Sequence, residues 1–409
     1  MNLSRRSLLA SFGVAGFAGL RWPAPLRATL AAEGSAGVTL PAVTLPAIDA
    51  ERIARRVVES LQPSPGERAL LVCDPLYYPE IAGAIQAGLR AAGANPVIAL
   101  NFDPPAIVRG EAAGTVPAEG IEERTVAFLR PLFEQAAIFL WLPAREISGD
   151  TRWEHLLAAS RARGIHFHWI MPLEGHGAEE VATLSRMYER AIVETDYPAL
   201  SREQDRLIAA LRGRSIRLSD ARGTDLRLHV PDDAWFHKND GDMSPARAAA
   251  GRSVRDREME FPSGALRFIP DVSSTEGRLV VTTPVPRTAA SPPEADTITL
   301  EFQRGRVVRH HAARDDAAFA RMWNEFGGDI DKVGEIVIGI NPLLAGTLPS
   351  GALPYYGYGA GHLRVSMGDN WESGGANRSP SGRPLWLFLD KPTVESAGAL
   401  LVKEGRMVR

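Results

Sequence analysis

Four side chains that could do chemistry lie within one glycine-rich stretch, residues 334–386. Glu335 follows a glycine at the start of an apolar run, and His362 and Arg364 precede a Gly-Asp-Asn turn that contains Asp369. Because side chains alternate along an extended strand, His362 and Arg364 are expected on the same face. Short apolar runs between glycines predict strands joined by tight turns. The stretch therefore predicts a ligand site built on strand ends.

Two interpretations of these residues differ in whether a metal ion is bound. In the first, Glu335, His362 and Asp369 hold one divalent metal ion (zinc, manganese or iron), with Glu372 as the base. In the second, Glu335 pairs with Arg364 across neighbouring strands, because a guanidinium repels a divalent cation and stabilises a buried carboxylate. Arg364 would then grip a substrate carboxylate with two parallel hydrogen bonds.

Aromatic residues beside these groups predict the apolar wall of the same site. Tyr355, Tyr356 and Trp371 are the candidate substrate-binding residues, and Tyr355, Tyr356 or Tyr358 could also join the residues that remain for a metal site. Flat aromatic rings commonly line small-molecule sites around a few polar groups. The expected ligand is a small molecule or a peptide.

The first half of the chain predicts a doubly wound α/β unit. Continuous apolar runs alternate with helical periods, which is typical of a parallel sheet covered on both faces. No G-x-G-x-x-G follows the first strand, so nicotinamide and flavin binding are not expected. The helices are expected over 53–61, 79–92, 122–135 and 152–163, and the strands over 69–73, 96–100, 137–142 and 165–171.

The second half predicts a β-rich region with long loops. Hairpins are expected at Ala221-Arg222-Gly223 and Arg304-Gly305, and helices over 201–212 and 315–324. The predicted organisation is a leader (1–32), a linker (33–48), an α/β domain (49–212) and a β-rich α+β domain (213–409) that carries the site.

Histidines outside the main stretch are interpreted mainly as structural. His166 and His168 alternate on one strand among aromatic residues, a pattern more typical of packed histidines than of metal ligands. His237, Asp240 and Asp242 could supply ligands, but acids of this spacing are more typical of a solvated turn.

The N-terminus predicts export. Arg5-Arg6 precedes a short apolar Gly/Ala-rich run and then small residues, as in a twin-arginine signal that is read by the export machinery. The run is shorter than a membrane-spanning helix requires. The net charge of −3 becomes more negative after cleavage, which argues against nucleic acid and anionic membranes as partners. A periplasmic or secreted location follows, and the single cysteine, Cys73, excludes an intramolecular disulfide.

The order of these features resembles the aminopeptidase T family of two-domain metallopeptidases and the ring-cleaving 2,5-dihydroxypyridine dioxygenase that shares its fold. The motifs are a Pro-Ser-Gly turn before residue 265, Gly-Glu at 334–335, and the Gly-rich strand ending at Gly368-Asp369-Asn370. The resemblance covers residues 48–400. It implies the two-domain α/β fold described above, a hydrolase acting on a peptide or small amide, and a homodimer.

The family's metal ligands are only partly retained. Family peptidases hold two metal ions with two glutamates, two histidines, an aspartate and a tyrosine. Ala265 stands at the first glutamate, Glu335 at the second and Arg364 at the first histidine, and the closing His-x-Asp is absent. The resemblance therefore implies a hydrolase with an altered or reduced metal site. The alternatives are a metal-free carboxylate-binding relative and a ring-cleaving non-haem iron dioxygenase.

Overall fold

The structure is a computed structural model. It describes most of the chain after the predicted leader, namely residues 47–73, 78–100, 130–142, 152–167, 178–281, 297–346, 357–380, 382, 384–389 and 391–408. The predicted leader and nearly all of the predicted linker lie outside these residues. Among the helices described, none combines the length and the apolar character that crossing a membrane requires.

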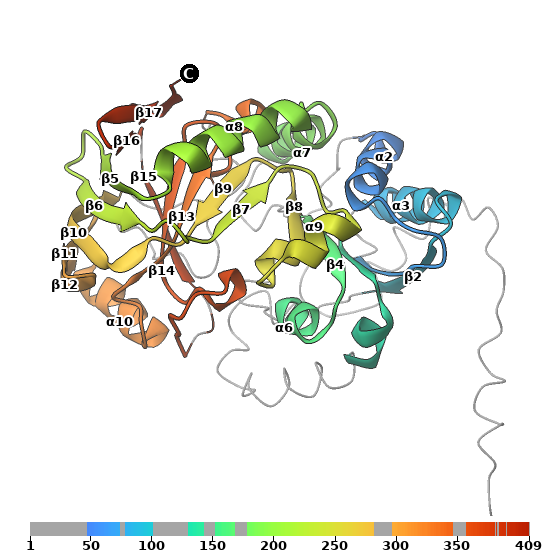
Figure 1. Ribbon diagram of the computed structural model, residues 1–409, viewed down its shortest axis with the longest axis horizontal. Coiled ribbons are helices and arrows are strands. Elements are labelled where there is room, and N and C mark those ends of the chain that lie inside the picture. The colour runs from blue at the N-terminus through green and yellow to red at the C-terminus, as the bar shows by residue number, and fades with distance from the viewer. Residues whose placement is uncertain are drawn as a thin grey trace, which may run out of the picture. The chain divides into compact units, whose positions relative to one another are not determined.

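The first sheet is parallel and has five strands in the order β2-β1-β3-β4-β8. Its strands are β1 (Arg68–Cys73), β2 (Asn95–Leu100), β3 (Ile138–Trp141), β4 (Arg163–Phe167) and β8 (Glu258–Phe261). Leu71 packs with helices on one face of the sheet, whereas Leu70 and Val72 pack on the other. This burial on both faces confirms the predicted doubly wound α/β unit (Figure 1).

Four helices accompany this sheet: α2 (Ala50–Leu61), α3 (Pro79–Ala91), α6 (Arg152–Ala159) and α7 (Ala178–Val193). The first three lie close to the predicted ranges, and residues 130–135 of the predicted helix 122–135 are helical. Helix α7 was not predicted from the sequence. The side chain of Asp49 caps α2 by accepting a hydrogen bond from the backbone N–H of Arg52.

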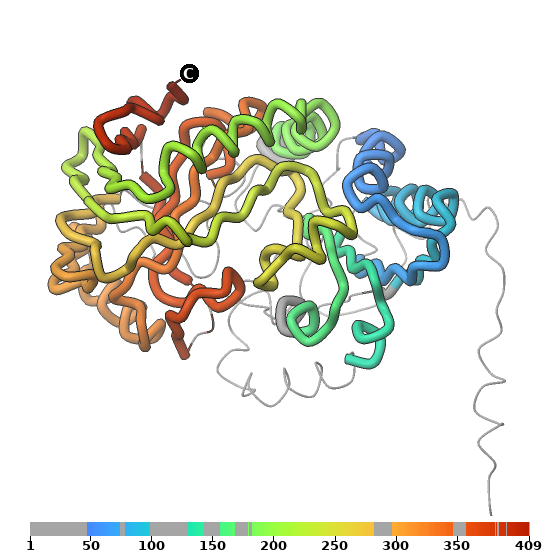
Figure 2. The backbone as a smooth tube through the Cα atoms, viewed as in Figure 1, coloured from blue at the N-terminus to red at the C-terminus, as the bar shows by residue number. Residues whose placement is uncertain are grey.

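The edge strand β8 comes from the second half of the sequence. The chain leaves the sheet after β4, forms α7, α8 (Tyr197–Leu211) and three further strands, and returns to pair β8 parallel to β4. Figure 2 shows this yellow segment beside the green strand. The predicted domain boundary at residues 212/213 stays a prediction. Strand β8 follows this boundary in the sequence but belongs to the parallel sheet formed by the strands before it.

The second sheet is antiparallel and has eight strands in the order β12-β11-β10-β6-β5-β16-β17-β18. The two predicted hairpins are confirmed, with positive φ at Gly223 and Gly305 where the chain reverses. The strands are β5 (Arg214–Ser219), β6 (Asp225–Val230), β10 (Asp271–Val281), β11 (Ile298–Gln303), β12 (Arg306–Ala312), β16 (Thr393–Ser396), β17 (Ala399–Lys403) and β18 (Arg406–Met407).

The third sheet is antiparallel and holds the glycine-rich stretch. Its order is β15-β14-β13-β9-β7, with β7 (Phe236–Asn239), β9 (Ala265–Phe268), β13 (Val333–Gly339), β14 (Leu363–Gly368) and β15 (Pro384–Leu389). Ile336 and Ile338 share one apolar core with the eight-stranded sheet and with α10 (Asp316–Phe326). Side chains alternate along the strands, so the opposite face of this sheet carries Glu335 and Arg364.

Short helical segments complete the described part of the chain: α9 (Pro245–Ala250), η2 (Arg255–Arg257), η3 (Pro342–Leu344) and η5 (Trp371–Ser373). The predicted helix 315–324 is confirmed as α10. The predicted helix 201–212 begins four residues earlier as α8, because the Asp196 side chain caps it by accepting from the N–H of Ala199.

Truncating the apolar face of the third sheet is expected to destabilise the fold. Ile338 is fully buried, so Ile338→Ala should lower the free energy of unfolding by about 2–5 kcal/mol through lost burial and a cavity. The matched control Val308→Ala, at a side chain with 55% exposure, should change it by less than about 0.5 kcal/mol. Urea unfolding measures both, and equal effects would contradict the assigned burial.

Candidate functional site

The polar face of the third sheet brings three charged residues together by strand register. Arg267 on β9 and Arg364 on β14 both pair with Val337 of the strand between them, β13. Glu335 lies two residues before Val337 and so on the same face. The carboxylate of Glu335 is therefore diagonal to a guanidinium on each neighbouring strand.

Glu335 is held by three groups and is only 5% exposed. Its Oε1 lies 3.4 Å from Nη1 of Arg267 and 3.3 Å from Nη2 of Arg364, and its Oε2 accepts from Oγ of Ser373 at 2.7 Å. Burial would raise the pKa of Glu335, but the two guanidiniums and the hydroxyl outweigh burial and lower it. The structure thus contains the ion pair that the sequence predicted between Glu335 and Arg364.

Arg267 connects this face to strand β8. Its Nη2 lies 2.6 and 2.5 Å from the two carboxylate oxygens of Glu260. The hydroxyl of Tyr358 contacts both Nη2 of Arg267 and Oε2 of Glu260. Burial raises the pKa of Tyr358, so the phenol stays protonated. Glu260 also accepts from the side-chain amide of Asn239 at 3.2 Å.

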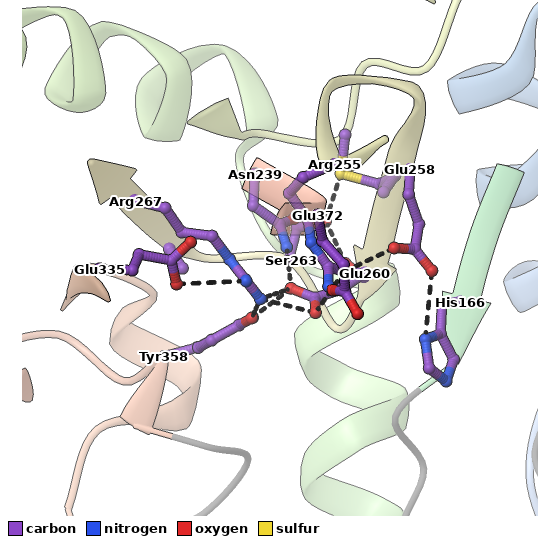
Figure 3. A network of polar contacts seen from close by, with 12 residues as sticks. His166, Asn239, Arg255, Glu258, Glu260, Ser263, Arg267, Glu335, Tyr358 and Glu372 are labelled. Atoms are coloured by element: carbon purple, nitrogen blue, oxygen red, sulfur yellow. Dashed lines mark hydrogen bonds and ion pairs between the residues drawn. The ribbon is translucent and has the colours of Figure 1, made fainter. Parts of the chain in front are cut away.

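Arg255 extends the network beyond Glu260. Its Nη1 lies 2.5 Å from Glu258 and 3.3 Å from Glu260, and its Nη2 contacts Glu372. Oε1 of Glu258 lies 3.2 Å from Nδ1 of His166 on β4. Acidic and basic side chains thus alternate from Glu335 on the third sheet to His166 on the parallel sheet (Figure 3).

The network shifts the pKa values of its carboxyl groups in opposite directions. Burial would raise the pKa of Glu258, but Arg255 and His166 hold it at about 2. Burial raises the pKa of Glu372, and the charge of Glu258 adds to this, although Arg255 works against both. Glu372, the predicted base, therefore keeps its proton to a higher pH than an ordinary glutamate, whereas Glu258 loses its proton at a lower pH.

Arg364 has the fewest partners among the three arginines of the network. It is 1% exposed, and burial lowers its pKa. Its guanidinium lies 4.6 Å from the ring centre of Trp386 and 5.9 Å from that of Tyr358. Nε of Arg364, Oγ of Ser366 and Nδ1 of His362 are all buried without a hydrogen-bond partner. The three residues alternate along β14 and its first flanking position, so they share one face.

The residues present do not fit a divalent metal ion. Both oxygens of Glu335 are engaged by arginine or serine donors. The Asp369 carboxylate accepts from the backbone N–H groups of Trp371 and Ser379, at 3.0 and 2.9 Å, and so braces the turn. Nowhere in the described part of the chain do three His, Cys, Asp or Glu side chains gather as a possible metal site, so Glu335, His362 and Asp369 are not brought together.

Several other predicted residues are placed differently or not at all. Tyr355, Tyr356 and His168 lie outside the described residues. Trp371 lies in η5, half-buried. His166 is packed, with its ring stacked on Trp141 at 4.0 Å, as the sequence pattern predicted.

The interpretation of His237 as part of a solvated turn is wrong. His237 lies on β7 and is 2% exposed, and Asp240 is also buried, at 5%. The turn-forming acids after residue 237 suggested a loop, but strand pairing with β9 buries the histidine.

Sequence reasoning also missed four charged residues of the network. Glu258 and Glu260 alternate on β8 and so share one face, whereas Arg255 and Arg267 lie at odd spacings from them that a period of two does not predict. Arg267 lies two residues after Ala265 on β9 and therefore on the same face of that strand. The missed residues are Arg255, Glu258, Glu260 and Arg267.

Two solved structures share this fold. Wild-type AmpT from Thermus thermophilus aligns with a TM-score of 0.61 at 15% identity, over 88% of this chain and 99% of that one. The 2,5-dihydroxypyridine dioxygenase from Pseudomonas putida KT2440 aligns with a TM-score of 0.58 at 16% identity, over 88% and 96%. No protein-family model and no curated protein matches the sequence. The fold expected from the resemblance is confirmed.

The depressed pKa of Glu258 predicts acid sensitivity. Its stabilising effect is complete above the ordinary glutamate value of 4.5 and is lost as the pH falls through about 2. Between pH 6 and pH 3 this residue should therefore account for a loss of about 2 kcal/mol in the free energy of unfolding. Urea unfolding at both pH values should show a smaller loss for Glu258→Gln than for wild type.

The control for this prediction is Glu301→Gln, which alters a glutamate whose side chain is 44% exposed. Its free energy of unfolding should fall between pH 6 and pH 3 by the same amount as that of the wild type. If the free energy for Glu258→Gln also fell by that amount, the charge of Glu258 would not be stabilised as described.

Proposed function

We propose that this protein is a metal-free relative of aminopeptidase T in fold, and that it binds a small carboxylate-bearing molecule at Arg364. The observation that carries this proposal is a guanidinium that is 1% exposed, has an unpartnered Nε and makes its ion pair with Glu335 at only 3.3 Å. A buried N–H group without an acceptor costs free energy, more so on a charged group. A ligand carboxylate supplies the acceptor and the opposite charge together.

Comparison of the three arginines supports Arg364 as the ligand contact. Arg255 and Arg267 each make an ion pair of 2.5 Å with a glutamate, whereas Arg364 makes one at 3.3 Å. Glu335 remains held by Ser373 and Arg267 if Arg364 turns toward a ligand. Arg364 can therefore take a second carboxylate with the least disruption of the network.

The surroundings of Arg364 suit a carboxylate on a flat or apolar molecule. Trp386 and Tyr358 lie beside the guanidinium and offer ring surface. Oγ of Ser366 and Nδ1 of His362 supply further unpartnered polar atoms along the same strand. Burial lowers the pKa of His362 to about 4, so its ring is neutral at physiological pH.

Hydrolysis of a peptide or small amide is a second candidate function. It is favoured by the raised pKa of Glu372, because a carboxyl whose pKa is raised by burial exchanges protons with a substrate more effectively than an ordinary glutamate. The likeness in fold to aminopeptidase T agrees with this candidate. Ring cleavage requires an iron site, and the described side chains do not supply one.

Export and assembly complete the proposal. The twin-arginine pattern at Arg5-Arg6 supports translocation to the periplasm or beyond, and a homodimer is proposed by analogy with the aminopeptidase T family. Neither bears on the chemistry at Arg364.

A thermal-shift screen of mature protein against aromatic and aliphatic carboxylates, amino acids and dipeptides tests the main candidate. At least one carboxylate should raise the melting temperature, and titration calorimetry should then give its Kd. Arg364→Met should weaken that binding by about 2–5 kcal/mol, because a buried charged contact is lost. Arg364→Lys should restore only part of it, since an ammonium lacks the planar fork.

The matched control is Arg309→Met, which alters an arginine whose side chain is 73% exposed and should leave the Kd unchanged. Carboxylate binding that survives in folded Arg364→Met would show that Arg364 is not the contact.

A further inference from the structure

His237 and Asp256 form an oriented pair outside the Arg364 region. Nδ1 of His237 lies 3.8 Å from Oδ1 of Asp256, and the ring is parallel to that of Trp235 within 12°. Acid–base contacts of this kind are often long in the absence of substrate and tighten in the complex. His237 is 2% exposed, and its Nε2 has no hydrogen-bond partner.

Asp256 is anchored so that it can orient the imidazole. Its carboxylate accepts from Nε1 of Trp235 at 3.0 Å and from the backbone N–H groups of Arg252 and Ser253 at 2.9 and 3.0 Å. Although burial would raise the pKa of Asp256, these donors and His237 hold it well below its ordinary value. The ionised carboxylate favours the proton on Nδ1, which leaves the lone pair on Nε2.

A hydrogen-bond donor lies directly across from this acceptor. His237 on β7 pairs in register with Arg267 on β9, and directly opposite side chains start about 4.5–5.5 Å apart at their Cβ atoms. Nε of Arg267 is buried and has no partner, although its two terminal nitrogens hold Glu335 and Glu260. An imidazole and a guanidinium, each with an unpartnered buried nitrogen, therefore lie on residues that are directly opposite in neighbouring strands.

We propose that His237 and Arg267 form an acyl-transfer site for small esters or amides, with Asp256 as the positioning residue. Nε2 of His237 takes a proton from water, and the resulting hydroxide attacks the acyl carbon. Arg267 donates to the carbonyl oxygen as negative charge develops there. The bond from carbon to the leaving oxygen or nitrogen breaks, and His237 returns the proton to the leaving group, so water is the only co-reactant.

The base of this site lies apart from the carboxylate contact, although Arg267 and Arg364 both contact Oε1 of Glu335. Strands β9 and β13 lie between β7 and β14, which sets the backbones of His237 and Arg364 roughly 14 Å apart at ordinary strand spacing. The acyl-transfer proposal therefore does not depend on a ligand at Arg364, and it uses a different base from Glu372.

Hydrolysis of p-nitrophenyl acetate by the mature protein, the chain without its predicted leader, tests this proposal. Two variants remove the base: His237→Asn, whose amide can still donate toward Asp256, and His237→Gln. Each should lower the rate by at least about 100-fold, the usual contribution of a general base. Asp256→Asn should also lower it, and His311→Gln, on a side chain that is 57% exposed, should leave it unchanged. Thermal melts establish that each variant is folded.

The pH profile provides a second readout that a purely structural histidine would not change. The charged groups around His237 are Asp256, Arg267 and Arg247. Burial and the two arginines lower the pKa of His237, against the opposing effect of Asp256. The wild-type rate should therefore decline with a midpoint below pH 6.5, the ordinary histidine value, as the base becomes protonated.

Three results would overturn the proposal. The first is a wild-type rate no faster than buffer. The second is a rate in folded His237→Asn or His237→Gln within twofold of wild type. The third is a rate lost in Glu372→Gln but kept in both His237 variants, which would assign the hydrolysis to Glu372 instead.

Discussion

Buried carboxylates on the polar face of the third sheet impose the main constraint on this molecule. Glu335 and Glu260 are 5% and 2% exposed, and an ionised carboxylate removed from water costs several kcal/mol unless positive charge and hydrogen bonds replace the water. Arg267 forms ion pairs with both carboxylates. Arg364 forms a second ion pair with Glu335, and Arg255 forms a second one with Glu260. The resemblance to metallopeptidases predicted metal ions as the positive charge here, whereas the described chain supplies guanidinium groups.

The same network couples the parallel sheet to the third sheet. Glu258 and Glu260 lie on β8, which belongs to the parallel sheet, yet their arginine partners lie in η2 and on β9. The opposite face of the third sheet is apolar and packs against the eight-stranded sheet. Because that packing fixes the strands, the charged side chains on the other face are held in place, which is the requirement for a preorganised site.

Sequence reasoning predicted the local features well and the long-range ones poorly. Continuous apolar runs between helical periods predicted the parallel sheet, and turn residues between alternating strands predicted the hairpins. The two-residue period of a strand placed His362 and Arg364 on one face. The contact of Glu260 with Tyr358 joins residues far apart in the chain, and no local pattern indicates it. Pairing of β7 with β9 likewise turned His237 from an expected loop residue into a buried one. Residue types could be read from the sequence, but tertiary pairing decided which of them became partners.

Titration calorimetry of chelator-treated mature protein with Zn²⁺ and Mn²⁺ tests the central claim most directly. If the guanidinium groups of Arg267 and Arg364 supply the positive charge at Glu335, wild type and Glu335→Gln should give the same heats, with no stoichiometric ion bound at this face. Binding of one or two ions per chain that disappears in Glu335→Gln would contradict the account and would make this site a metal centre.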